Sequence, residues 1–180
     1  NASRLAAAAP APDTTKTTTS ALARLGRIRP EQRFVVHASG FRASPSAPVS
    51  AIWVAGELQA PPEEFAMGAT AAIEVGGSPA VGESTATLKQ GERGFVVKIP
   101  VPAGTSGALD IRARMTPAAG GTPLMDAAKL DLDPALQQPL LFRRGLSTGN
   151  RLQPAAGFQF SRTDRLHLEL PISTATPGTG

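Results

Sequence analysis

The chain has 180 residues, a formal net charge of +4 and no cysteine. The absence of cysteine excludes disulfides, thiolate nucleophiles and cysteine-bound zinc. No run of about 18 apolar residues is present, so we expect no membrane insertion. Gly and Pro together make up about a fifth of the residues, which is typical of many tight turns between short elements.

The beginning of the chain is a low-complexity segment of Ala, Pro and Thr. Such a composition buries too little apolar surface to fold alone, so we expect a linker there, and Asn1-Ala2 is consistent with the remnant of a cleaved tag. The predicted organisation is a linker, a β-sandwich domain, a C-terminal extension and a flexible tail, over residues 1–26, 27–134, 135–172 and 173–180.

The middle of the chain repeats short segments in which apolar residues occupy every second position. A pleated strand sends successive side chains to opposite faces, so each segment has one face to bury and one to expose. Turn residues separate the segments at the spacing of an antiparallel sandwich. The expected strands are Arg33–Ala38, Ala51–Leu58, Thr70–Val75, Ser84–Leu88, Phe95–Val101, Ala108–Met115 and Lys129–Leu132, with Leu124 as an alternative start of the last.

These strands predict an all-β fold, an immunoglobulin-like or fibronectin III-like sandwich of seven to eight strands with extended tails. The Cys…Trp…Cys pattern of true immunoglobulin domains is absent, so the prediction concerns architecture alone. Within Ala51–Leu58, Trp53 lies on the face opposite Ile52 and Val54. Trp53 is either an exposed platform for a ligand or a core residue, and we favour the core.

The character of the chain changes after Pro134. Gln138–Gly145 is a short apolar stretch that ends in two arginines, and a turn-rich segment follows it. Arg165–Ile172 alternates cleanly, with its leucines on one face. A single strand is not stable by itself, so this one either adds to the sandwich or begins a following domain; we favour the first.

The extension also holds the best candidate for a site, a group of five arginines. The planar guanidinium suits carboxylate or phosphate groups, and the turn Ser147–Asn150 offers backbone N–H groups for an anion-binding nest. The alternative, which we favour, is that these arginines pair with local acids such as Asp164 and Glu169, or fasten the segment to the sandwich. The tentative anion-binding residues are Arg143, Arg144, Arg151, Arg162 and Arg165.

No convincing catalytic set is present. His37 and His167 both fall at outward-facing strand positions, and no G-x-S-x-G elbow supports a triad of a serine with His167 and Asp164. Asp131 and Asp133 follow a calcium-like pattern, but a solvated strand end explains them better. The scarcity of aromatic residues, 4% of the chain, argues against single-stranded nucleic-acid binding. We expect no enzyme, no metal and no cofactor.

Three stretches carry a resemblance to a family: AIWVAGEL (51–58), PLLFRRGLSTGNRLQP (139–154) and FSRTDRLHLELP (160–171). Together they resemble the β-rich region that follows the von Willebrand factor A domain in bacterial VWFA-related proteins. The resemblance implies an exported, multidomain protein in which this part is an accessory module. The Asp-x-Ser-x-Ser metal motif of the A domain is absent from this chain, so no metal site or adhesion activity is carried over.

The expected function is that of a non-enzymatic spacer or protein-interaction module of an exported, periplasmic or extracellular, bacterial protein. Its partner is then another protein or an upstream domain of the same protein. An unpaired sheet edge is the expected contact surface, because its N–H and C=O groups can accept a partner strand. The alternative is a module that binds polyanions or acidic glycans through the arginines of the extension.

Overall fold

Seven antiparallel strands form a two-layer sandwich, as predicted. The computed structural model describes residues 32–44, 46–59, 63–133 and 137–169, all within one compact unit that spans Glu31–Gly180. A short 3-10 helix, η1 (Glu63–Phe65), connects the second and third strands. The strands are β1 (Phe34–Arg42), β2 (Val49–Leu58), β3 (Ala69–Gly76), β4 (Gly82–Leu88), β5 (Gly94–Pro100), β6 (Ala108–Pro117) and β7 (Leu124–Asp131).

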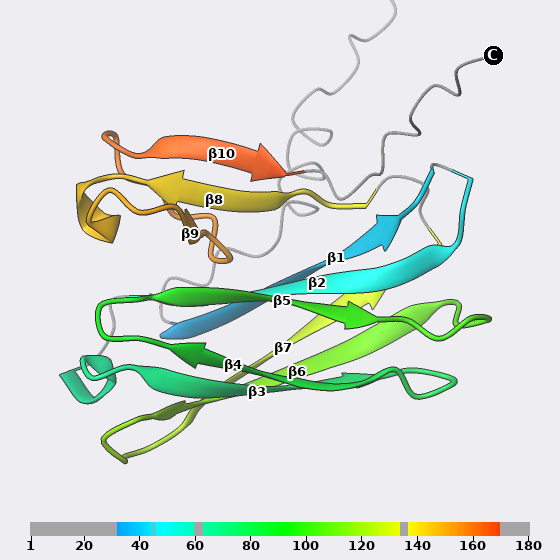
Figure 1. The fold of residues 1–180 in the computed structure, drawn as a ribbon, viewed down its shortest axis with the longest axis horizontal. Coiled ribbons are helices and arrows are strands. Elements are labelled where there is room, and N and C mark those ends of the chain that lie inside the picture. Colours follow the sequence, from blue (N-terminus) through cyan, green and yellow to red (C-terminus); the bar gives the residue numbers. More distant parts are fainter. Residues whose placement is uncertain (1–31, 45, 60–62, 134–136, 170–180) are drawn as a thin grey trace, which may run out of the picture. The chain divides into compact units, whose positions relative to one another are not determined.

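The strands divide into two sheets that face each other (Figure 1). Sheet A has the order β1-β2-β5, and sheet B has the order β4-β3-β6-β7. In an immunoglobulin constant domain the fourth strand belongs to the same sheet as the first, second and fifth strands, and this four-stranded sheet faces a three-stranded one. Here β4 pairs with β3 instead, so sheet A has three strands and sheet B has four. The predicted all-β sandwich is confirmed.

The core lies between the inner faces of sheets A and B. Strands β3 and β6 alternate strictly between buried and exposed residues, which is the pattern that predicted them. Gly56 on β2 has a packing role, because a Cβ there would lie 2.3 Å from the ring of Phe95. The largest fully buried apolar side chains are Phe34, Ile52, Val54, Leu58, Ile73, Leu109, Ile111, Met115 and, outside this core, Leu140.

The extension forms a third sheet, sheet C, with the strand order β10-β8-β9. Sheet C packs against the outer face of sheet A, where Leu140, Phe142 and Ala156 meet Ala55 and Trp53. The strand predicted over 165–172 pairs with β8 of the same extension rather than with a sheet of the sandwich. The elements of the extension are β8 (Leu140–Arg144), η2 (Leu146–Thr148), β9 (Gln153–Pro154) and β10 (Arg165–Glu169).

The linker expected over 1–26 and the tail expected over 173–180 lie outside the described residues, as do Leu170 and Ile172 of the last predicted strand. In the part of the chain that the structure describes, no helix has the length and apolar character needed to cross a membrane.

Candidate functional site

A buried ion pair fastens sheet C to sheet A. Arg143 on β8 donates through Nη2 to Oε1 of Glu57 on β2, and the two side chains are 8% and 0% exposed. Arg143 Nη1 also donates to the carbonyl oxygen of Gln159 at 2.6 Å, and the N–H of Gly157 donates to Glu57 Oε2 at 3.1 Å. Each charged group therefore meets both its counter-charge and a backbone partner from the extension.

Burial sets the electrostatics of this pair. It raises the pKa of Glu57 above its ordinary value, while Arg143 and the N–H of Gly157 act in the opposite direction. Burial, and then the charge of Arg143, lower the pKa of the neighbouring Arg93. Burying charges is costly unless they are paired, so separating Arg143 from Glu57 would be unfavourable. Arg143 therefore anchors the extension, and its guanidinium is buried rather than exposed to solvent.

Further polar contacts hold the segment that leads into β8. Ser39 Oγ donates to the carbonyl oxygen of Gln138, and the N–H of Gly40 donates to Gln137 Oε1 at 3.3 Å. His37 Nε2 lies 3.3 Å from the carbonyl oxygen of Pro139. Burial lowers the pKa of His37, against the effect of that carbonyl. The outward-facing histidine predicted on β1 thus points away from the sandwich core but is covered by the extension.

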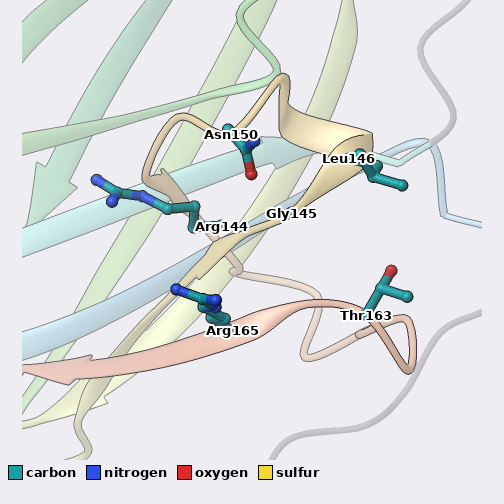
Figure 2. Close-up of a pocket in the computed structure, with 6 residues that line it drawn as sticks. All are labelled: Arg144, Gly145, Leu146, Asn150, Thr163 and Arg165. Atoms are coloured by element: carbon teal, nitrogen blue, oxygen red, sulfur yellow. The ribbon is translucent and has the colours of Figure 1, made fainter.

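Arg144 and Arg165 are the two predicted site residues that the structure brings together. They are directly opposed partners in the β8–β10 ladder. Both line an open hollow of about 460 Å³, together with Gly145, Leu146, Asn150 and Thr163. In Figure 2 the two arginine side chains extend from neighbouring strands toward the same side, and Asn150 projects from the turn that follows β8.

The charge at this hollow is not balanced by a contact within the described residues. No hydrogen bond or ion pair in that part of the chain holds the guanidinium of Arg144 or Arg165. Asp164 lies nearby, against Gly145, and accepts the N–H of Ser161 at 2.8 Å. Directly opposed like charges on neighbouring strands repel, so the pair favours an anion placed between the two guanidinium groups.

The other two arginines of the predicted group lie elsewhere. Arg151 is exposed, and its Nη2 lies 3.5 Å from the carbonyl oxygen of Gly91 in the turn between β4 and β5. Arg162 is exposed in the turn before β10. The predicted backbone nest does not form, because the N–H groups of Thr148, Gly149 and Asn150 all donate to carbonyls of their own turn.

Trp53 is a partly buried packing residue rather than an exposed platform, and the two aspartates lie in a solvated segment at the end of a strand. Trp53 is half-buried and packs beneath sheet C. Asp131 accepts the N–H of Asp133 at 3.0 Å, and both are exposed. Among the described residues no group of three His, Cys, Asp or Glu side chains is arranged to hold a metal ion. His167 Nε2 lies 3.4 Å from Glu169 Oε1.

Sequence reasoning missed Glu57, although a signal for it was present. Glu57 shares the outer face of β2 with Trp53 and Ala55, and a carboxylate on an otherwise apolar face indicates a buried partner. Asn150 and Thr163 gave no comparable signal, because their place beside Arg144 follows from the turn and the ladder register.

Comparison with protein-family models, with curated proteins and with solved structures finds no match to this chain.

Proposed function

We propose that the chain is a non-enzymatic β-sandwich module that binds an acidic polymer through Arg144 and Arg165. The observation that carries the proposal is the direct cross-strand pairing of two exposed arginines at one hollow. An anion between them replaces repulsion with charge-assisted hydrogen bonds to two planar guanidinium groups. Carboxylate and sulfate groups of acidic glycans have the matching geometry.

The form of the hollow favours one acidic group of a polymer over an enclosed small molecule. Arg144, Leu146 and Asn150 are all exposed, whereas small-molecule sites bury most of their ligand. The resemblance to VWFA-related proteins supports a place as an accessory module in an exported, multidomain bacterial protein. In that setting the module attaches its parent protein to an acidic surface, and its chemistry requires no cofactor.

The test is titration calorimetry of the chain with an oligogalacturonate, which carries a carboxylate on every sugar. We expect binding at low salt that weakens near 0.15 M, where the Debye length is about 8 Å. Hydrogen bonds to charged groups contribute roughly 1.5–3 kcal/mol, so Arg144→Ala and Arg165→Ala should each weaken binding about tenfold or more.

Arg114→Ala is the matched control, because Arg114 is also an exposed strand arginine but lies on sheet B. It removes the same charge without touching the hollow, and we expect binding close to that of the wild type. Equal losses in Arg144→Ala and Arg114→Ala would reduce the effect to net charge and overturn the site. No binding of oligogalacturonate or of a heparin oligosaccharide would leave the role of a spacer.

A further inference from the structure

Strand β10 is the least covered strand of sheet C. Strands β8 and β9 contact strands of sheet A, whereas β10 packs mainly on β8, and Figure 1 draws it farthest from the sandwich. Within the described residues its outer edge pairs with no strand. Its leucines, Leu166 and Leu168, are 57% and 50% exposed.

β4, an edge strand of sheet B, differs from β10 in the residues that it exposes. The exposed positions of β4 are polar, among them Glu83, Thr85 and Thr87, which is how edge strands avoid pairing with other chains. β10 instead combines an open edge with two exposed leucines on one face. An edge of this composition is suited to the addition of a strand.

The residues of β10 determine which strand fits. We propose that β10 pairs with β10 of a second copy of the chain, antiparallel, about a two-fold axis at His167. The strand reads Arg-Leu-His-Leu-Glu. In this register Arg165 opposes Glu169 of the second copy and Leu166 opposes Leu168, at both ends of the pairing. Opposite charges and apolar side chains at directly opposed positions both stabilise a ladder.

Other self-pairings lose this match. A parallel, in-register pairing places Arg165 opposite Arg165 and Glu169 opposite Glu169. An antiparallel pairing centred on Leu166 places Arg165 opposite His167 and Asp164 opposite Leu168. A centre at Leu168 leaves Arg165 without Glu169. Charge complementarity therefore selects the His167-centred register, and a one-residue slip also moves each side chain to the other face.

The resulting dimer is isologous, with the same strand on both copies, and joins two copies of sheet C into one six-stranded sheet. A pairing of five residues covers far less than the roughly 1,200–2,000 Å² of a stable interface, so we expect a weak dimer. It goes beyond the proposed anion binding: Arg165 belongs to both, but Arg144 takes no part in the strand pairing.

Cross-linking tests the two-fold axis directly. The chain has no cysteine, so His167→Cys introduces one thiol per copy. Cα atoms of directly opposed strand residues lie about 4.5–5.5 Å apart, within the range that a disulfide spans. Under mild oxidation we expect covalent dimers of His167→Cys to form at least about tenfold faster than those of Thr87→Cys, the control on β4. Equal rates would overturn the proposal.

Charge exchange tests the register in the cysteine-free chain. Sedimentation equilibrium over about 10 µM to 1 mM should show association of the wild type that Arg165→Glu or Glu169→Arg weakens about tenfold. The double variant Arg165→Glu/Glu169→Arg should regain association, because the opposed charges are again opposite. The side chains of both positions are exposed or partly exposed, and circular dichroism verifies that each variant is folded.

Three outcomes of the sedimentation experiment overturn the dimer: a wild type that is monomeric throughout, association that neither single variant changes, and a double variant that stays monomeric. Arg144→Ala separates this inference from the proposed function, since it should weaken anion binding about tenfold or more and leave association within about twofold of the wild type.

Discussion

Sheet A is joined to its two neighbouring sheets in different ways. Its inner face meets sheet B through a large continuous apolar core to which all seven sandwich strands contribute. Its outer face meets sheet C through a small apolar cluster and a set of buried polar contacts that include the Arg143–Glu57 ion pair.

The two interfaces differ in what they supply: the apolar one supplies stability, and the polar one determines where sheet C docks. The inner interface gains stability in proportion to the apolar area removed from water, about 25 cal/mol per Å². The outer interface gains little from a buried ion pair, because desolvation offsets much of the attraction. Its polar contacts instead specify where sheet C docks. We therefore expect the sandwich to remain folded under conditions that release sheet C.

The largest effect should come from the inner core. Ile73→Ala, at a fully buried position on β3, should lower the free energy of unfolding by roughly 2–5 kcal/mol through lost burial and a cavity. Urea denaturation measures it. Thr70→Ala on the exposed face of the same strand is the control, with an expected change within about 0.5 kcal/mol. A similar loss in both variants would contradict this account of the core.

The next effect should be local to the extension. Arg143→Met leaves the Glu57 carboxylate buried without its partner, which typically costs about 3–5 kcal/mol when the structure cannot relax. Release of sheet C limits that cost, so global unfolding should change less than in Ile73→Ala. Hydrogen exchange should show faster exchange of the β8 and β10 amides, with those of β3 and β6 unchanged.

The double variant Arg143→Met/Glu57→Leu sharpens the same point. It removes both charges and keeps apolar volume, a replacement that is often neutral or stabilising. Exchange of the β8 amides should return to within about threefold of the wild-type rate. If the double variant exchanges as fast as Arg143→Met, the buried carboxylate is not the cause of the release.

A smaller effect should appear on acidification. His37 has a pKa below its ordinary value of 6.5, so the unfolded or undocked chain binds more protons than the folded one. The stability contributed by neutral His37 is present above 6.5 and is lost as the pH falls through the lowered pKa. The melting temperature of the wild type should therefore fall more than that of His37→Gln between about pH 7 and pH 5.

Glu57 contributes a pH dependence of its own. Its pKa is raised, so stability is lost as pH rises from the ordinary range of a carboxyl group through that raised pKa. The comparison with His37→Gln isolates the histidine because both proteins keep Glu57. If the melting temperatures of the two proteins fall equally between about pH 7 and pH 5, burial of His37 does not contribute to the pH dependence of stability.

The smallest effect on stability should come from Arg144→Ala. The side chain is exposed and joins no ion pair among the described residues, so the free energy of unfolding should change by at most about 0.5 kcal/mol. Neighbouring arginines on β8 would then divide cleanly, with Arg143 required for docking and Arg144 free for binding. A loss of more than 1 kcal/mol would mean that Arg144 also anchors sheet C.

The sandwich could be predicted because apolar residues recur at every second position in its strands. β3 and β6 alternate along their whole length, and the alternative start at Leu124 is the observed start of β7. The expected first strand ended too early, since β1 continues to Arg42. The extension covers Ser39 on its outer face while Gly40 is buried beside Val49 and Gln137, so consecutive residues are buried and the alternation fades.

Sheet C was predicted only in part: the strand expected over 165–172 is β10 (Arg165–Glu169), but its neighbours β8 and β9 and the docking of sheet C on sheet A were not predicted. β9 contributes two residues, too few to form a pattern, and Glu57 finds Arg143 across 86 positions of the chain. The five arginines were grouped because they are close in the sequence, which does not place them close in space. Neighbours on a strand point to opposite faces, which is why Arg143 and Arg144 have different environments.

The length of that Arg143–Glu57 connection has a consequence for biosynthesis. β7 ends at Asp131, N-terminal to every strand of sheet C, so the seven sandwich strands leave the ribosome first and we expect them to fold first. We expect the extension to dock last, on a sandwich that already carries the Glu57 carboxylate. A contact that forms after the sandwich is complete should also open separately, so we expect sheet C to detach and return without unfolding the sandwich.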